Sequence, residues 1–323
     1  LKADILLNLD TEDDDEFSIG CAGGIDTNTK YSYSEEVASG IAYAITVRGL
    51  KGGHSGMDID SGRGNANKWL SRILWTLSQK INVQLMSFDG GGLRNAIPRE
   101  ASCFVAIQNN ECDSFSDIFR TMVETFKDEY DSIENQMDLS FTETNSSSDA
   151  ISSKDFKKIV NTLCSVHNGV FRMSPDIDGL VETSSSLARV EIKNGTFITQ
   201  SLQRSSVDTT RDEVAMVIKS CFENMDCDVV QSGEYPGWQP NPNSKILVIM
   251  EQLYKDMFKE DPQVKACHAG LECGLLGERY PGLDMISFGP TIKGAHSPDE
   301  RCSIKSTAKF WLFLKEILAN VPK

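Results

Sequence analysis

The alternation of apolar and polar residues predicts two kinds of sheet. ADILLNLD (residues 3–10) is a continuous apolar run that ends in a carboxylate, which is typical of a central strand with its functional end at Asp10. From Tyr43 onward, apolar and polar residues alternate as in half-buried antiparallel strands. These strands and several helical segments form two successive sets. The predicted strands lie near 43–50, 82–88, 102–108, 137–143, 169–173, 184–205 and 227–233. The predicted helices lie near 66–79, 113–127, 153–164 and 210–224.

The middle of the chain therefore predicts an α+β domain of ferredoxin-like modules, spanning residues 22–232. Within it, Asn194-Gly195 stands between two alternating runs and predicts a tight hairpin. GEYPGWQPNPNS (residues 233–244) is rich in Pro, Gly and Asn and marks the end of this domain.

After this boundary, strands alternate with helices. This pattern predicts an α/β domain with a mostly parallel sheet and helices on both faces. Because residues 3–10 share this character, we expect one α/β domain (1–21 and 233–323) interrupted by the inserted α+β domain (22–232). Leu1 opens directly into a strand, so we also expect the chain to continue something longer.

The composition narrows the function classes. The 323 residues suffice for two domains, and 47 acidic against 32 basic side chains give a formal charge of -15. This balance, with no basic stripe, excludes nucleic acid as a partner. No apolar run reaches the ~18 residues that span a bilayer, so no membrane is expected. Nine cysteines, mostly single and in apolar stretches, indicate a reducing compartment, and we expect a cytoplasmic protein.

Two residues far apart in the chain could bind a metal ion. Asp10 ends the first strand, and His296 lies in TIKGAHSPDE, after a late strand. Carboxylate and imidazole are common ligands of zinc and related ions, and α/β sheets place their sites beyond the carboxyl ends of strands. Asp10 could equally be a turn or helix-capping residue, and His296 a surface residue.

Two glycine-rich segments suggest a second group of functional residues. In KGGHSGMDIDSGRGN, glycines on both sides of His54 allow a close backbone approach, and the imidazole could donate a hydrogen bond to an oxyanion. In GGGLRNAIPRE, Arg94 and Asn95 could hydrogen-bond a carbonyl or carboxylate. Arg204, in SLQRSS, could bind a substrate carboxylate through two bonds. The alternatives are a structural turn for the first loop and a solvent-facing strand arginine for Arg204.

The segment ACHAGLECG places His268 and Glu272 around a strand-to-helix turn. The neighbouring Cys267 and His268 do not indicate a cysteine protease, because neither residue lies in a loop signature of that class. Neither a G-x-G-x-x-G after a strand nor a P-loop occurs, so nucleotide binding is not expected.

The motifs together resemble a known family. LLNLDTE, GLKGGHSGMDIDSGRGNANK, GGGLRNAIPREA, YPGWQP, HAGLECGL and DMISFGPTIKGAHSPDE follow the order and spacing of the aminoacyl-histidine dipeptidase family. This family belongs to the dinuclear-zinc metallopeptidases, which include carnosinases and aminoacylases. The resemblance implies a metallodipeptidase that hydrolyses Xaa-His and carnosine-like dipeptides with a metal-activated water. It also makes residues 1–21 and 233–323 the catalytic domain and residues 22–232 a lid domain, through which two chains would form a homodimer.

The resemblance also assigns roles to residues. It implies two divalent metal ions, zinc first with manganese or cobalt as alternatives, and it makes Asp10 and His296 metal ligands. His54 matches the lid histidine that stabilises the tetrahedral intermediate. Asn95 and Arg204 match substrate-binding positions of the lid.

On weaker grounds, the resemblance places His268 and Glu272 near the substrate.

One part of the family pattern is not found in this sequence. The His-x-Asp motif, the bridging aspartate and the Glu-Glu pair of the family precede the strand that ends at Asp10. With these 323 residues alone, two metal ligands and no general base are available, so we expect this fragment by itself to be inactive. The alternatives are another amidohydrolase of the superfamily (an aminoacylase or tripeptidase), or a non-catalytic dimerisation or binding fragment.

Overall fold

A computed structural model describes residues 2–145, 149–293 and 299–321 of the chain. It divides into two compact units. Unit 1 comprises Leu1–Gly24, Ser205–Asp208 and Tyr235–Lys323, and unit 2 comprises Ile25–Arg204 and Thr209–Glu234. The division expected from the sequence, at residues 21/22 and 232/233, remains a prediction.

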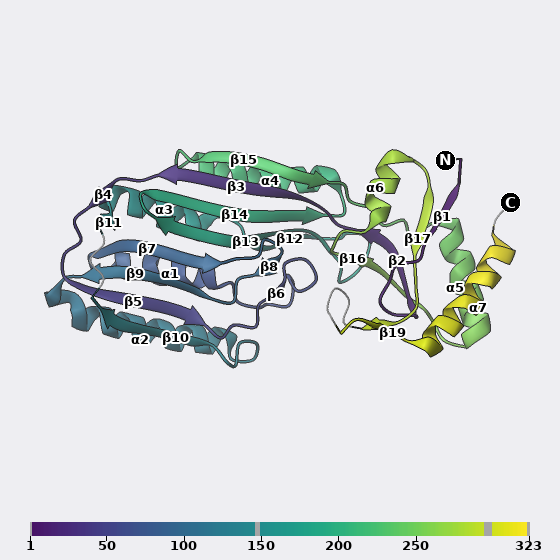
Figure 1. Ribbon diagram of the computed structural model, residues 1–323, viewed down its shortest axis with the longest axis horizontal. Helices are drawn as coiled ribbons and strands as arrows, with labels where there is room; N and C mark the ends of the chain where they lie inside the picture. The colour runs from purple at the N-terminus through teal and green to yellow at the C-terminus, as the bar shows by residue number, and fades with distance from the viewer. Residues whose placement is uncertain (1, 146–148, 294–298, 322–323) are drawn as a thin grey trace. The chain divides into compact units, whose positions relative to one another are not determined.

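Unit 1 is built on a four-stranded sheet in the order β1-β17-β2-β16 (Figure 1). β1 pairs with β17 and β16 pairs with β2 in parallel, whereas β17 meets β2 antiparallel at the single pair Ser287–Ser18. The sheet is thus mostly parallel, as the sequence predicts. The elements of unit 1 are β1 (Ile5–Asn8), β2 (Glu16–Cys21), α5 (Lys245–Phe258), β16 (Gln263–Cys267), α6 (Glu272–Arg279), β17 (Asp284–Ser287), β18 (Ile292–Lys293), β19 (Arg301–Cys302) and α7 (Ile304–Asn320).

Two apolar clusters cover the sheet of unit 1. Met285 packs with Cys273 of α6 and with Trp238, whereas Phe288 packs edge-on against Phe313 of α7. Residues an odd number of positions apart in an extended segment point to opposite sides, so α6 and α7 cover different faces. This arrangement confirms the predicted α/β architecture.

The first strand is only partly buried within the described residues. Its continuous apolar run indicates a central, fully buried strand, yet all four residues of β1 are only half-buried and Leu9 is 49% exposed. Within the described residues β1 lies at the edge of the sheet, with β17 as its neighbour. An edge position leaves one side of a strand uncovered, so the predicted central position of β1 stays a prediction.

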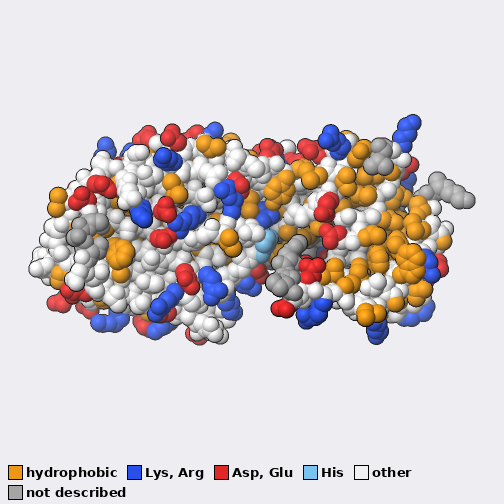
Figure 2. Space-filling view, in the orientation of Figure 1, with side chains coloured by type: hydrophobic (Ala, Val, Ile, Leu, Met, Phe, Trp, Pro, Cys, Tyr) orange, Lys and Arg blue, Asp and Glu red, His pale blue; other side chains and the backbone are white. Residues whose placement is uncertain are grey.

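Large apolar side chains also lie on the surface of unit 1. In Figure 2 hydrophobic side chains gather over α5 and α7, and the most exposed of these include Val248, Ile304, Trp311, Leu312 and Leu318. None of the helices in the described ranges is long and apolar enough to cross a membrane.

Unit 2 contains a nine-stranded sheet in the order β10-β5-β9-β7-β13-β14-β3-β15, with β12 paired to β13 (Figure 1). β7 and β13 join a four-stranded half to a five-stranded half through an antiparallel ladder between residues 88–91 and 189–192. The strands are β3 (Gly23–Ser32), β4 (Glu35–Glu36), β5 (Ile41–Arg48), β6 (Gly53–His54), β7 (Val83–Gly91), β8 (Ala96–Ile97), β9 (Ala101–Ile107), β10 (Asp138–Thr144), β11 (Ala150–Ile151), β12 (Gly169–Met173), β13 (Val181–Lys193), β14 (Thr196–Ser205) and β15 (Asp228–Tyr235).

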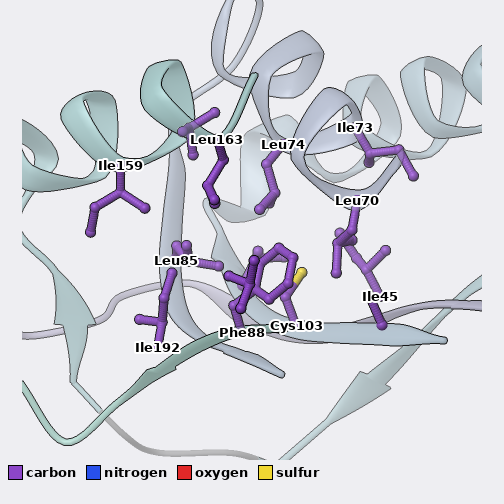
Figure 3. Packing of buried hydrophobic residues seen from close by; sticks show 14 of the residues in the cluster. Ile45, Leu70, Ile73, Leu74, Leu85, Phe88, Cys103, Ile159, Leu163 and Ile192 are labelled. Atoms are coloured by element: carbon purple, nitrogen blue, oxygen red, sulfur yellow. The ribbon is translucent and has the colours of Figure 1, made fainter. Parts of the chain in front are cut away.

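The helices of unit 2 contribute to one hydrophobic core with this sheet. They are α1 (Ala66–Ser78), α2 (Cys112–Tyr130), α3 (Ser153–Ser165) and α4 (Asp208–Glu223), with a short 3-10 turn at Asn109–Glu111. Leu70 and Leu74 of α1 and Ile159 of α3 face Leu85 and Phe88 of β7 across the core (Figure 3). Two successive sets of strands and helices, as the sequence predicts, thus form this α+β unit.

Candidate functional site

A short ladder in unit 2 positions His54. β6 pairs antiparallel with β8, so that Gly53 lies opposite Ile97 and His54 opposite Ala96. The N–H of Ser55 donates to the backbone carbonyl of Asn95 at 2.8 Å. The two glycine-rich segments are therefore held together at their tips, with His54 in β6 and Asn95 in the turn just before β8.

The imidazole of His54 has one nitrogen fixed by the backbone. Its Nδ1 accepts the N–H of Gly56 at 3.2 Å and the N–H of Met57 at 3.1 Å. A nitrogen that accepts two hydrogen bonds carries no proton, so the neutral ring bears its proton on Nε2. Burial lowers the pKa of His54 and the positive charge of Arg204 lowers it further, while Asp58 acts in the opposite direction. The ring is thus a neutral donor through Nε2.

An ion pair between Asp58 and Arg63 stabilises the loop around His54. Asp58 Oδ2 accepts the backbone N–H of His54 at 2.8 Å, and Asp58 pairs with Arg63 at 2.9 Å. Arg63 also donates to the carbonyl of Gly52 at 2.7 Å. Gly53 has a φ of +141°, and a side chain there would collide with this ion pair. Glycine is therefore required at this position.

Arg204 and a second ion pair lie beside this loop. Arg204 is the penultimate residue of β14 and is 5% exposed, and its charge influences both His54 and Asp26. Arg94 forms an ion pair with Asp26 of β3 at 2.7 Å, so its guanidinium already has a carboxylate partner within the protein. Burial raises the pKa of Asp26, whereas Arg94 and Arg204 oppose that rise. Among the predicted residues of unit 2, the structure thus groups His54, Asn95 and Arg204.

In unit 1, Asp10 follows the carboxyl end of β1. Its side chain is exposed, and its backbone carbonyl accepts the hydroxyl of Ser287 at 2.7 Å. Asn8 also donates to the Ser287 hydroxyl, at 3.1 Å. These bonds join the ends of two parallel strands, which is where an open α/β sheet places its site.

His268 and Glu272 flank the turn that follows β16. His268 is buried, whereas Glu272 is exposed at the start of α6. Burial raises the pKa of Cys273 to about 12, and Cys21, Glu272 and Asp10 contribute to the rise. Asp10 and Glu272 therefore both lie near Cys273, so three of the predicted residues belong to one region of unit 1.

The metal site predicted from Asp10 and His296 is described only in part. His296 lies outside the described residues. Within residues 2–145, 149–293 and 299–321, no group of three or more His, Cys, Asp or Glu side chains could hold a metal ion. The described donors therefore do not fit a complete metal site by themselves.

The sequence did not reveal the residues that support His54. Asp58 and Arg63 lie in the same glycine-rich segment, but the pattern assigned neither of them to the support of His54. Asp26 and Glu134 are distant in the chain and carry no local signal. Only the folded chain brings these carboxylates to the two glycine-rich loops.

Comparisons with known proteins identify the family. Residues 45–134 match the model of a peptidase dimerisation domain. The chain is 38% identical over 324 residues to the cytosol non-specific dipeptidase of Escherichia coli (strain K12), covering 100% of this chain and 67% of that protein. It is 25% identical to the succinyl-diaminopimelate desuccinylase of a Nitratiruptor species over 117 residues, which is 36% of this chain and 32% of that protein.

A solved structure shows the same fold. The crystal structure of aminoacylhistidine dipeptidase from Vibrio alginolyticus superposes with a TM-score of 0.96 at 38% identity, covering 100% of this chain and 66% of that one. The chain spans about two thirds of the length of both dipeptidases. By this similarity the chain belongs to the M20 family of peptidases, in the group of the cytosol non-specific and aminoacylhistidine dipeptidases.

Proposed function

We propose that this protein hydrolyses dipeptides, among them Xaa-His and carnosine-like peptides, and that the reaction depends on divalent metal ions. The observation that carries the proposal is the grouping of His54, Asn95 and Arg204 in a chain that matches two dipeptidases over its full length. The names of these relatives supply the substrate class.

His54 supplies a hydrogen-bond donor in this proposal. Because its Nδ1 accepts two backbone N–H groups, Nε2 presents the proton without any change of tautomer. A preorganised donor aimed at the developing oxyanion stabilises the tetrahedral intermediate more than the ground state. The lowered pKa of His54 keeps its ring neutral at pH 7, so no anion has to bind beside the imidazole to balance a positive charge.

Asn95 and Arg204 orient the substrate. The exposed Asn95 offers an amide that can donate to a carbonyl and accept from an N–H. The planar guanidinium of Arg204 suits the terminal carboxylate of a dipeptide through two parallel bonds. Arg94 is less suited to this role, because Asp26 already binds it. We place His268 and Glu272 of unit 1 near the substrate as well.

Membership of the M20 metallopeptidases implies divalent metal ions. We propose two, zinc first with manganese or cobalt as alternatives, with Asp10 and His296 among the ligands. Asp10 is an exposed carboxylate at a strand end, which supports this role. Because the described residues do not form a complete metal site, we assign no reaction step to the metals.

We propose that two chains associate through the lid, which corresponds to unit 2. The matched dimerisation domain, residues 45–134, lies within that unit. Sedimentation equilibrium tests the proposal: a particle mass of twice the intact mass of one chain is expected, and a single-chain mass would contradict it. We also propose a cytoplasmic location, which the nine free thiols and the name of the E. coli relative support.

The function is tested on the purified protein by three linked measurements. Intact mass and metal content are determined by mass spectrometry, and hydrolysis of β-Ala-His, Gly-His, a tripeptide and an N-acetyl amino acid is followed with zinc, manganese or cobalt present. Bound metal with preferential dipeptide cleavage supports the proposal. Preference for the tripeptide or the N-acetyl amino acid would indicate another amidohydrolase. A metal-free protein that cleaves none of them would indicate a non-catalytic chain.

A further inference from the structure

A buried carboxylate joins the two ends of the loop that carries His54. Glu134 is fully buried, just beyond the end of α2. Its Oε2 accepts the N–H of Lys51 at 2.8 Å, and its Oε1 accepts the N–H of Gly64 at 2.8 Å. The segment from Lys51 to Gly64 therefore begins and ends on one side chain.

These two bonds constrain the loop strongly. A carboxylate is costly to bury unless hydrogen bonds satisfy its oxygens, and backbone N–H groups are strong partners for it. Glu134 is itself fixed, because its own N–H donates to the carbonyl of Tyr130 at 2.7 Å. Any movement of Lys51 or Gly64 would leave a buried oxygen with one bond fewer.

The inner bonds of the loop depend on this anchor. The Asp58–Arg63 pair connects the peptide of His54 to residues next to Gly64, and Arg63 also holds Gly52, next to Lys51. The N–H groups of Gly56 and Met57 then reach Nδ1 of His54. The anchor at Glu134 thus fixes the frame within which the imidazole receives its two bonds.

We propose that Glu134 is a positioning residue for His54. By fixing Lys51 and Gly64, it holds the loop in the conformation that keeps Nδ1 an acceptor and Nε2 the donor. The role in the reaction rests on the proposed function, whereas the effect on the imidazole does not.

The test compares Glu134→Gln with a matched control, Asp155→Asn. Asp155 is another buried carboxyl of unit 2, bonded to Tyr31, Ser34 and Ser152 and remote in sequence from the His54 loop. In Glu134→Gln, one acceptor oxygen becomes an NH2 group that faces a backbone N–H. We expect kcat to fall roughly 10- to 100-fold with a smaller change in KM. Asp155→Asn should lower stability and leave kcat within about twofold, as expected of a change outside the site.

A double variant separates positioning from general destabilisation. If Glu134 acts through His54, Glu134→Gln should have little further effect on kcat when His54→Ala is already present. Equal effects in both backgrounds, or a loss of kcat in Asp155→Asn as large as that in Glu134→Gln, would overturn the proposal.

The ring nitrogens provide a readout that does not require activity. In long-range ¹⁵N–¹H spectra of the protein, with the His54 signals identified by their loss in His54→Ala, we expect an unprotonated Nδ1 and a protonated Nε2. Glu134→Gln should shift both signals toward a mixture of tautomers. An unchanged tautomer would overturn the proposal, even if the protein cleaves no dipeptide and the proposed function fails.

Discussion

The backbone carbonyl of Asn95 accepts the N–H of Ser55 at 2.8 Å, next to the facing pair of His54 and Ala96. This bond joins two glycine-rich loops that are distant in the sequence. It brings together the neutral imidazole of His54, in β6, and Asn95, in the turn before β8, and Arg204 is close enough to lower the imidazole pKa. The proposed oxyanion donor and the two proposed substrate-binding residues thus all lie in unit 2.

The first prediction concerns His54 as an oxyanion donor. His54→Ala should lower kcat about 10²- to 10³-fold, because one preorganised donor is lost. His167→Ala is the control, since His167 is also half-buried with a pKa lowered by burial but bonds to the carbonyl of Gly169 instead. Steady-state kinetics on a dipeptide measure both variants. Equal kcat for His54→Ala and the unchanged protein would remove His54 from the reaction.

The second prediction compares two neighbouring glycines. Gly91 ends β7 with a φ of +72°, and a Cβ there would collide with the carbonyl oxygen of Ala188, whereas a Cβ at Gly92 would meet nothing within 4 Å. Gly91→Ala should lower the free energy of unfolding by at least about 2 kcal/mol, and Gly92→Ala should change it by less than about 0.5 kcal/mol. Urea unfolding of the two variants measures the difference. Similar losses in both would show that the backbone at Gly91 can relax.

Local signals in the sequence predicted several parts of the fold. Asn194 and Gly195 have φ values of 52° and 72° and connect β13 to β14, as a two-residue hairpin requires. The helices of unit 2 follow the spacing of apolar residues, because each buries one face against the same sheet. The predicted central position of β1 stays a prediction, since β1 has one strand neighbour within the described residues and an apolar run does not report how many neighbours a strand has.

The supporting groups of the site could not be predicted in this way. Glu134 contacts Lys51, 83 residues earlier in the chain, and its segment SIENQM contains nothing that distinguishes a buried carboxylate from an exposed one. Glycines around His54 predicted a close backbone approach, but not which side chain the backbone approaches. The resemblance to a family supplied roles for residues, whereas the bonds that fix those residues emerged only from the fold.

The third prediction concerns stability in mild acid. Burial lowers the pKa of both His54 and His167 below the ordinary value of 6.5. Below that pH the unfolded chain binds protons that the folded chain does not, so the free energy of unfolding should fall as the pH drops from 7.5 to 5. Well above pH 7 both forms are neutral and the effect vanishes.

Urea unfolding at several pH values measures this slope, and His167→Gln is the comparison. Removing one of the two imidazoles should make the curve flatter between pH 7 and pH 5. An unchanged slope would mean that His167 titrates alike in the folded and unfolded chain.

The fourth prediction concerns a lysine that binds the backbone carbonyls at the C-terminus of a helix. The ammonium group of Lys68 donates to the carbonyls of Leu163, Cys164 and Val166 at 2.6, 2.9 and 2.8 Å, where α3 ends. The last carbonyls of a helix have no partner within it and carry partial negative charge, so a half-buried cation stabilises them in two ways. Lys68→Met keeps the aliphatic stem but leaves three acceptors without this donor, and should lower the free energy of unfolding by about 2 to 3 kcal/mol.

The control is Lys157→Met, at an exposed position of α3, which should lower the free energy of unfolding by less than about 0.5 kcal/mol. Hydrogen exchange at the C-terminal turn of α3, measured beside urea unfolding, should accelerate only in Lys68→Met. Unchanged exchange there would show that water replaces the ammonium group without loss.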